Sequence, residues 1–135
     1  MLPTIDTIVV IPAQTDIPFI TQFTVHDTGI SQNNSIENGD SVDVTISVKN
    51  IGISTSQPYS ISLTSADTSI IIYQSEQNTQ ALLPEETQTL TNSFGFFIKE
   101  STPDYSVVPL SFTITNSKGQ QFIFNKSFHV QSPIS

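Results

Sequence analysis

The segment Ser41–Asn50 alternates apolar and polar side chains over its whole length. Val42, Val44, Ile46 and Val48 fall on one parity, and polar or charged residues fall on the other. Because successive side chains of a strand point to opposite faces, this pattern predicts a strand with one buried and one solvent-facing side. All four apolar residues are β-branched, which suits a pleated, half-buried surface. A chain with such a segment is constrained to a β-sheet fold.

Six further segments either share this two-residue period or are short apolar runs. They are Phe19–Val25, Tyr59–Thr64, Ile70–Tyr73, Leu90–Ile98, Val108–Thr115 and Phe122–Val130. We expect Phe19, Thr21, Phe23 and Val25 to share the inward face of the first segment. Lys126 falls on the inward parity of the last segment, which predicts a bulge or an edge position there.

Turn-forming residues separate these segments. Asn38-Gly39 precedes the second strand and supplies the positive φ that a tight turn requires. Asn116–Gly119 joins two alternating runs and predicts a hairpin connection. Seven or eight short strands, with no apolar stripe of helical period, indicate a β-sandwich or a barrel.

The length of 135 residues suits one domain. We expect residues 17–131 to form the β-domain and residues 132–135 a C-terminal tail. Residues 1–16 would be an N-terminal arm or a connection from a preceding domain, with an extra strand possible over Thr4–Pro12. No apolar run approaches the roughly 20 residues that span a bilayer, so no membrane insertion is expected.

Charged residues make up only 12 % of the chain, against roughly 25 % in an average globular protein. Their place is taken by 17 Thr, 19 Ser, 8 Asn and 11 Gln, a composition common in exported β-domains. The net charge is −8, and the sequence contains neither arginine nor cysteine. Nucleic-acid binding needs clustered cations, which four lysines cannot supply. Redox chemistry and zinc sites built on cysteine are excluded as well.

Most of the chain, roughly Asp27 to Val130, resembles the immunoglobulin-like modules that follow the catalytic domain in gingipain-type and subtilisin-type secreted bacterial proteases. It is also similar to cell-adhesion-related modules of bacterial surface proteins. The resemblance rests on a polar loop, a Gly-acid pair, an alternating strand and an Asn-x-Gly ending. Here these are His26–Asn34, Gly39-Asp40, Ser41–Lys49 and Asn50–Gly52, with a later loop at Leu83–Thr87. The chain departs from the pattern with Asp40 where Glu is usual, Asn38 where Pro is usual, and no glycine in the later loop.

This resemblance implies an all-β, immunoglobulin-like antiparallel sandwich of seven to eight strands, without catalytic residues. We therefore expect a spacer, stabilising or adhesive module of a larger secreted or cell-surface bacterial protein, with a protease as one class of parent. Its partners would be neighbouring domains of that protein, or a cell-surface protein or glycan. In isolation it would be a monomer. The alternatives are a carbohydrate- or calcium-binding module, or a structural subunit of a filament or virion.

Catalysis is not indicated by the acids, bases and nucleophiles of the chain. His26 and His129 are the only histidines, and each is expected on the solvent face of a strand. His26 and Asp27 are neighbours in a strand, so their side chains point to opposite faces. Glu85 and Glu86 lie in a turn and do not face each other across a cleft, as a glycosidase pair must. We expect no enzyme activity.

Calcium is the one metal that the sequence favours, because hard cations take oxygen ligands. The polar loop before the second strand brings together Asp27, Asn33, Asn34, Glu37 and Asp40. The spacing does not match an EF-hand, and Asn and Asp also fill loops because they form local turns. We therefore expect a turn without a metal and no cofactor, with calcium bound by this loop as the alternative.

Sugar binding would require an exposed aromatic ring on which a sugar can stack. Tryptophan is absent, so the candidates are Tyr59, Tyr73, Tyr105 and Phe97. Tyr59 faces inward by its parity, and Phe97 faces away from Phe96.

Overall fold

The computed structural model describes residues 16–27, 36–103 and 105–130. Residues 1–15 of the predicted arm, Asn33 and Asn34 in the polar loop, and the predicted tail lie outside these residues. The described part contains eight strands, and it has no helix long and apolar enough to cross a membrane. The strands are β1 (Pro18–Asp27), β2 (Ser41–Asn50), β3 (Ser60–Thr64), β4 (Ile70–Gln74), β5 (Glu76–Asn78), β6 (Thr87–Ile98), β7 (Val107–Thr115) and β8 (Gln121–His129).

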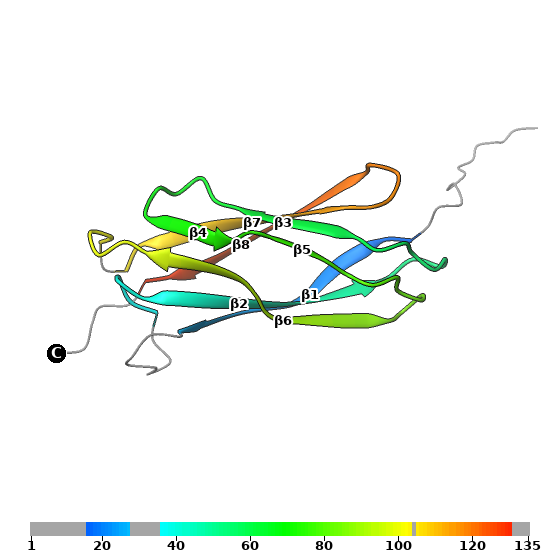
Figure 1. Cartoon of the computed structure of the whole chain (residues 1–135), viewed down its shortest axis with the longest axis horizontal. Coiled ribbons are helices and arrows are strands. Elements are labelled where there is room, and N and C mark those ends of the chain that lie inside the picture. The colour runs from blue at the N-terminus through cyan, green and yellow to red at the C-terminus, as the bar shows by residue number, and fades with distance from the viewer. Residues whose placement is uncertain (1–15, 28–35, 104, 131–135) are drawn as a thin grey trace, which may run out of the picture.

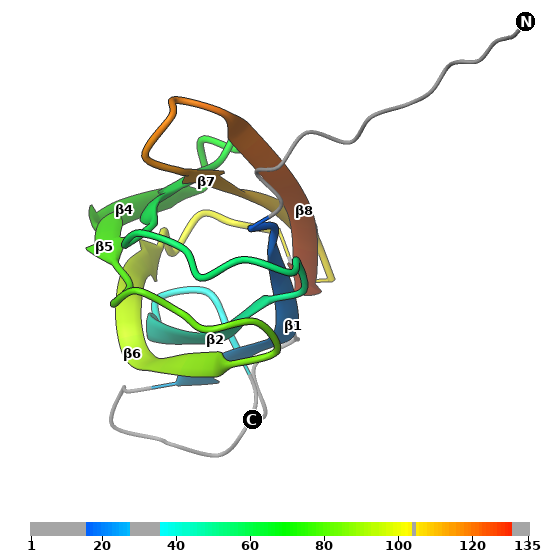
Figure 2. The same cartoon turned by 90° about the vertical axis from the view of Figure 1, so that its right-hand side faces the viewer.

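The strands form two four-stranded antiparallel sheets packed face to face (Figure 1). Sheet 1 has the order β1-β2-β6-β4, and sheet 2 has the order β5-β3-β7-β8. At the sides of the sandwich, β1 comes close to β8 and β5 comes close to β6 (Figure 2). The predicted all-β antiparallel sandwich is therefore confirmed.

The immunoglobulin-like character expected from the sequence stays a prediction, and the strand order is compatible with it. With β5 left aside, β1-β2-β6-β4 facing β3-β7-β8 corresponds to strands A, B, E and D facing C, F and G. The chain has neither the cysteine pair nor the tryptophan of antibody domains. The likeness is therefore one of connectivity alone.

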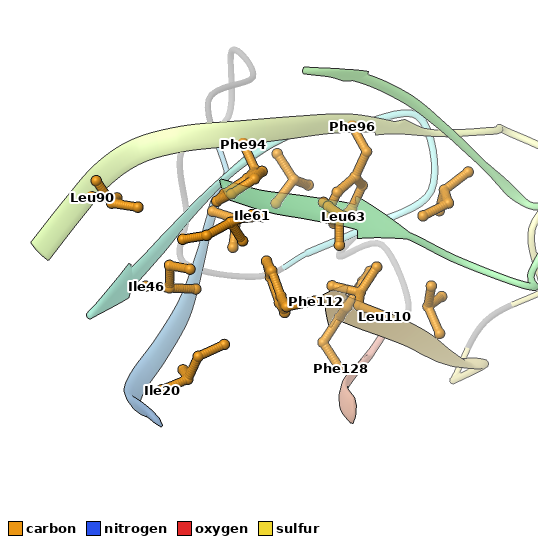
Figure 3. Packing of buried hydrophobic residues seen from close by; sticks show 14 of the residues in the cluster. Ile20, Ile46, Ile61, Leu63, Leu90, Phe94, Phe96, Leu110, Phe112 and Phe128 are labelled. Atoms are coloured by element: carbon orange, nitrogen blue, oxygen red, sulfur yellow. The ribbon is translucent and has the colours of Figure 1, made fainter. Parts of the chain in front are cut away.

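The core is built from the alternating residues that the sequence predicted to face inward (Figure 3). These inward-facing residues are all 8 % exposed or less in β2, β3, β6 and β7, and so is Tyr59 just before β3. They are Val42, Val44, Ile46, Val48, Tyr59, Ile61, Leu63, Leu90, Phe94, Phe96, Ile98, Val108, Leu110, Phe112 and Ile114. Burial of apolar area at about 25 cal/mol per Å² makes this layer the main stabilising contribution.

Aromatic rings tie the two sheets together across this layer. Phe112 of sheet 2 meets Phe94 and Phe23 of sheet 1 edge-to-face, at centroid distances of 5.4 and 5.9 Å. Phe96 of sheet 1 stacks on Phe128 of sheet 2 at 5.3 Å. Phe112 is fully buried, so its ring fills the middle of the sandwich.

The predicted inward face of the first strand is wrong at its start. Phe19 is 45 % exposed and Thr21 is exposed, whereas Ile20 is buried in the core. The pairing of β1 with β2 shifts between Ile20 and Gln22, so one extra residue reverses the parity there. Phe19 instead contacts Phe124 of β8 edge-to-face at 5.6 Å, at one side of the sandwich.

Sheet 2 decides between the two alternatives predicted at Lys126, and it contains one strand that was not predicted. The bulge considered at Lys126 is absent from the described strand, because β8 pairs with β7 in unbroken register from Gln121 to His129. The alternative, an edge position, is confirmed, since β8 is the last strand of sheet 2. The three-residue strand β5 has no apolar signal and was not predicted.

Removing the central ring should weaken the sandwich strongly. Phe112→Ala should lower the free energy of unfolding by about 3–5 kcal/mol, because it deletes a buried ring and leaves a cavity. Phe112→Asp should prevent folding, since it would bury an unpaired charge. Urea denaturation followed by circular dichroism measures both. Thr113→Ala, on the outer face of the same strand, is the matched control and should change stability little. A stable Phe112→Asp variant would contradict the assignment of the inner faces.

Candidate functional site

The two ends of the described chain lie at opposite ends of the sandwich. Ile17 accepts a hydrogen bond from the Ile51 amide at 2.8 Å, beyond the last residue of β2. Val130 exchanges hydrogen bonds with Ser106 and Tyr105, just before β7 begins. We call the end that holds Ile17 and Ile51 the entry pole and the end that holds Val130 and Ser106 the exit pole (Figure 1).

The poles are separated by the length of the strands. Ten residues of β2 run from the exit pole at Ser41 to the entry pole at Asn50. At about 3.3 Å per residue, this places the poles roughly 30 Å apart. A chain that enters at Ile17 and leaves at Val130 therefore traverses the long axis of the domain.

The entry pole is organised by the carboxamide of Asn50, which is fully buried. Its Oδ1 accepts hydrogen bonds from the Ile17 amide at 3.1 Å and the Gly52 amide at 2.9 Å. Its Nδ2 donates to the carbonyls of Ser54 at 2.7 Å and Leu82 at 3.0 Å. A single side chain thus joins the incoming chain to the β2–β3 and β5–β6 connections. The sequence marked Asn50 as a strand-ending turn residue but gave no signal for this role.

The exit pole is organised by the predicted Asn38-Gly39 turn. Gly39 has a φ of 85°, as expected for this dipeptide. Its amide donates to the Ile98 carbonyl at 2.8 Å, and the Asn38 Nδ2 donates to the Thr102 carbonyl at 3.1 Å. The turn thereby fastens the start of β2 to the end of β6.

The structure places three of the five candidate calcium ligands at the exit pole, and the other two, Asn33 and Asn34, lie outside the described residues. Asp27 ends β1 and is 2 % exposed, while Glu37 and Asp40 belong to the turn before β2. Burial is the main cause that raises the pKa of Asp40, and the charges of Asp27 and Glu37 raise it further. A hydrogen bond from the Glu37 amide, at 2.8 Å to Asp40 Oδ2, acts in the opposite direction.

This geometry gives Asp40 a structural role in the turn. Within residues 16–27, 36–103 and 105–130, no three carboxylate or imidazole side chains gather closely enough to hold a metal ion. A calcium site here stays a prediction from the sequence.

The two histidines occupy opposite sheets. His26 is exposed on β1, and His129 is exposed on β8. Glu85 is an exposed loop residue whose carboxylate contacts Lys49 Nζ at 2.9 Å. An exposed pair of this kind adds little stability.

The aromatic candidates for sugar binding have different environments. Tyr59 is fully buried, and its hydroxyl donates to Asp16 Oδ2 at 3.1 Å, so its ring is not available for stacking. Phe97 is half-buried on β6, and Tyr105 is 66 % exposed in the loop before β7. Tyr73 of β4 is 55 % exposed and lies over Gly95 of β6. A glycine between Phe94 and Phe96 was the sequence signal for such a close approach, and it was missed.

A shallow polar hollow lies on sheet 2, with a volume of about 380 Å³. Its lining comes from β3, β5 and β7: Ser60, Ile61, Ser62, Glu76, Gln77, Asn78, Thr113 and Thr115. These side chains offer mainly hydroxyl, amide and carboxylate groups. Hydrogen bonds made in the presence of water give little net free energy, so this hollow alone supports no strong ligand site.

No family model matches the chain, and no curated protein matches it. One similar solved structure is the crystal structure of BslA, a bacterial hydrophobin, with a TM-score of 0.38 and 11 % identity. That match covers 91 % of this chain and all of the other. A second is the solution structure of a lipoprotein from Bacteroides thetaiotaomicron, with a TM-score of 0.35 and 15 % identity, covering 91 % and 89 % of the two chains. Similarity this low carries no inference about role, and the expected kinship with protease accessory modules stays a prediction.

Loss of the Asn50 side chain should destabilise the entry pole. Asn50→Ala removes all four hydrogen bonds of the buried carboxamide, so the free energy of unfolding should fall by at least about 2 kcal/mol. Urea denaturation measures the change. Asn125→Ala is the control, because Asn125 is exposed on β8 and should change stability by less than about 0.5 kcal/mol.

Neutralising Asp40 should stabilise the protein at pH 7 in calcium-free buffer. Its pKa in the folded state lies above the usual 3.8, so folding disfavours the charged form. Asp40→Asn keeps an oxygen that can accept from the Glu37 amide and removes that penalty. The gain should disappear as the pH falls below the pKa in the unfolded state, where Asp40 itself is neutral. Thermal melts at neutral and acidic pH test this, and a less stable variant at pH 7 would contradict it.

The same pair of proteins tests the calcium prediction. If the exit pole binds calcium, millimolar calcium should raise the melting temperature of the wild type and affect Asp40→Asn much less. An unchanged wild-type melt would overturn the calcium prediction.

Proposed function

We propose that this chain is a non-catalytic spacer module of a larger secreted or cell-surface bacterial protein. In this role it sets the distance between the parts of that protein on its N-terminal and C-terminal sides. The observation that carries the proposal is the position of Ile17 and Val130 at opposite poles of an elongated sandwich.

The pairing of the first and last strands suits this role. β1 is hydrogen-bonded to β2, and β8 to β7, in ladders that run along the axis between the poles. Tension applied at Ile17 and Val130 would act along these strands, so it would load many hydrogen bonds of each ladder together. Asn50 adds a buried anchor where the chain enters.

The outer faces support a location outside the cell. Between the buried positions the strands carry Ser and Thr, including Ser60, Ser62, Thr113 and Thr115. Uncharged hydroxyl side chains keep a sheet soluble without the usual density of charge. Secreted proteases belong to the proposal as one class of parent, on the basis of the resemblance between roughly Asp27–Val130 and their accessory modules.

Small-angle X-ray scattering of a tandem repeat tests the spacer role. Two copies of residues 16–130 joined by a short Gly/Ser linker should have a maximum dimension roughly 30 Å or more above that of a single copy. The single copy, verified by circular dichroism, is the control. A tandem in which the copies lie side by side, with little increase in maximum dimension, would contradict the proposal.

A further inference from the structure

An aromatic ring is held against the outer face of sheet 1, next to a carboxylate. The ring is Tyr73 of the edge strand β4, and it lies across Gly95 of β6. A Cβ atom on Gly95 would stand only 2.5 Å from Tyr73 Cε1 and 2.9 Å from Cζ. The glycine is therefore required by the ring. Because Tyr73 is still 55 % exposed, one side of the ring packs on backbone and much of the rest faces solvent.

The carboxylate belongs to Asp43 of β2. Asp43 is directly opposite Gly95 in the β2–β6 pairing, and it is opposite His26 in the β1–β2 pairing. Burial raises the pKa of Tyr73, and the charge of Asp43 raises it further, whereas a hydrogen bond with Ser41 lowers it. The phenol end of the ring therefore lies near both Asp43 and Ser41.

Apolar residues two positions along from Tyr73 and Gly95 continue the surface on β4 and β6. Ile71 of β4 is 52 % exposed and pairs with Phe97 of β6, which in turn pairs with Ser41. We call Tyr73, Asp43, Ile71 and Phe97 the Tyr73 platform. It combines a fixed aromatic ring, a negative charge and an apolar rim on one face of the sheet.

We propose that the Tyr73 platform is a docking site for an arginine side chain of a partner protein. A guanidinium group stacks on aromatic faces and also binds carboxylates in a planar fork, so it can use Tyr73 and Asp43 together. Its aliphatic stem would lie on Ile71 and Phe97. The net charge of −8 favours the approach of a cationic partner, and this chain contains no arginine of its own.

One basic side chain of this chain also lies opposite Asp43. His26 is the basic side chain placed opposite Asp43 by the strand register, and it is exposed at the far side from Tyr73. A neutral sugar could also stack on the ring and donate hydroxyl hydrogen bonds to Asp43, but its binding would depend little on salt. The proposal does not rest on the spacer role, because its readout is local binding and not particle length.

An NMR titration at low ionic strength tests the proposal with the full chain. The probe is the peptide acetyl-Gly-Arg-Gly-amide, and its counterpart with citrulline keeps the shape of arginine without the charge. The arginine peptide should shift the Tyr73 ring and Asp43 amide signals with millimolar affinity, and added salt should weaken it. Asp43→Asn and Tyr73→Leu should each weaken binding about two- to fivefold. Tyr73→Phe keeps the ring and should bind, as should Tyr105→Leu, which alters an exposed tyrosine outside the platform.

Three results would overturn the proposal. The citrulline peptide could bind as well as the arginine peptide, or Asp43→Asn could bind like the wild type. Methyl glycosides could shift the same signals while the arginine peptide does not, which would identify a sugar site. If Tyr73→Leu does not fold, Asp43→Asn and Tyr73→Phe still test the proposal, because both variants keep an aromatic ring over Gly95.

Discussion

The apolar layer between the two sheets is the constraint on which the rest of the structure depends. The long strands β2 and β7 place every second side chain in this layer, and the rings of Phe94, Phe112 and Phe23 meet at its centre. No disulfide contributes, since the chain has no cysteine. The outer faces are therefore free to vary in composition, and they carry Ser and Thr in place of the usual charges.

The sequence predicted this layer well because a two-residue period is a local property of the chain. The alternation within Val42–Val48 and within Val108–Ile114 was enough to predict which of their side chains are buried. Phe19 was misplaced because a single extra residue in β1 reverses the parity, and nothing local distinguishes a bulge from a regular strand. β5 was missed because Glu76–Asn78 has no apolar face, and its pairing with β3 depends on where β4 ends.

The candidate sites depend even more on contacts between residues that are distant in the sequence. Asp27, Glu37 and Asp40 were expected near one another, and the structure brings Asp40 under the influence of both other charges. Two of the four hydrogen bonds of Asn50, with Ile17 and Leu82, join segments more than 30 residues apart, so sequence alone could not reveal them. The Tyr73 platform likewise depends on the register between β4, β6 and β2. Only Gly95, between two buried phenylalanines, hinted at a close contact.

The four edge strands have a consequence for behaviour at high concentration. An unpaired strand edge can template the addition of another chain, and each edge here carries a feature that opposes this. β1 and β4 are interrupted by register shifts, β5 is only three residues long, and β8 has Lys126 in its middle. A protein crowded many copies deep on a surface would gain from such edges, because its copies could touch without merging into continuous amyloid-like sheets.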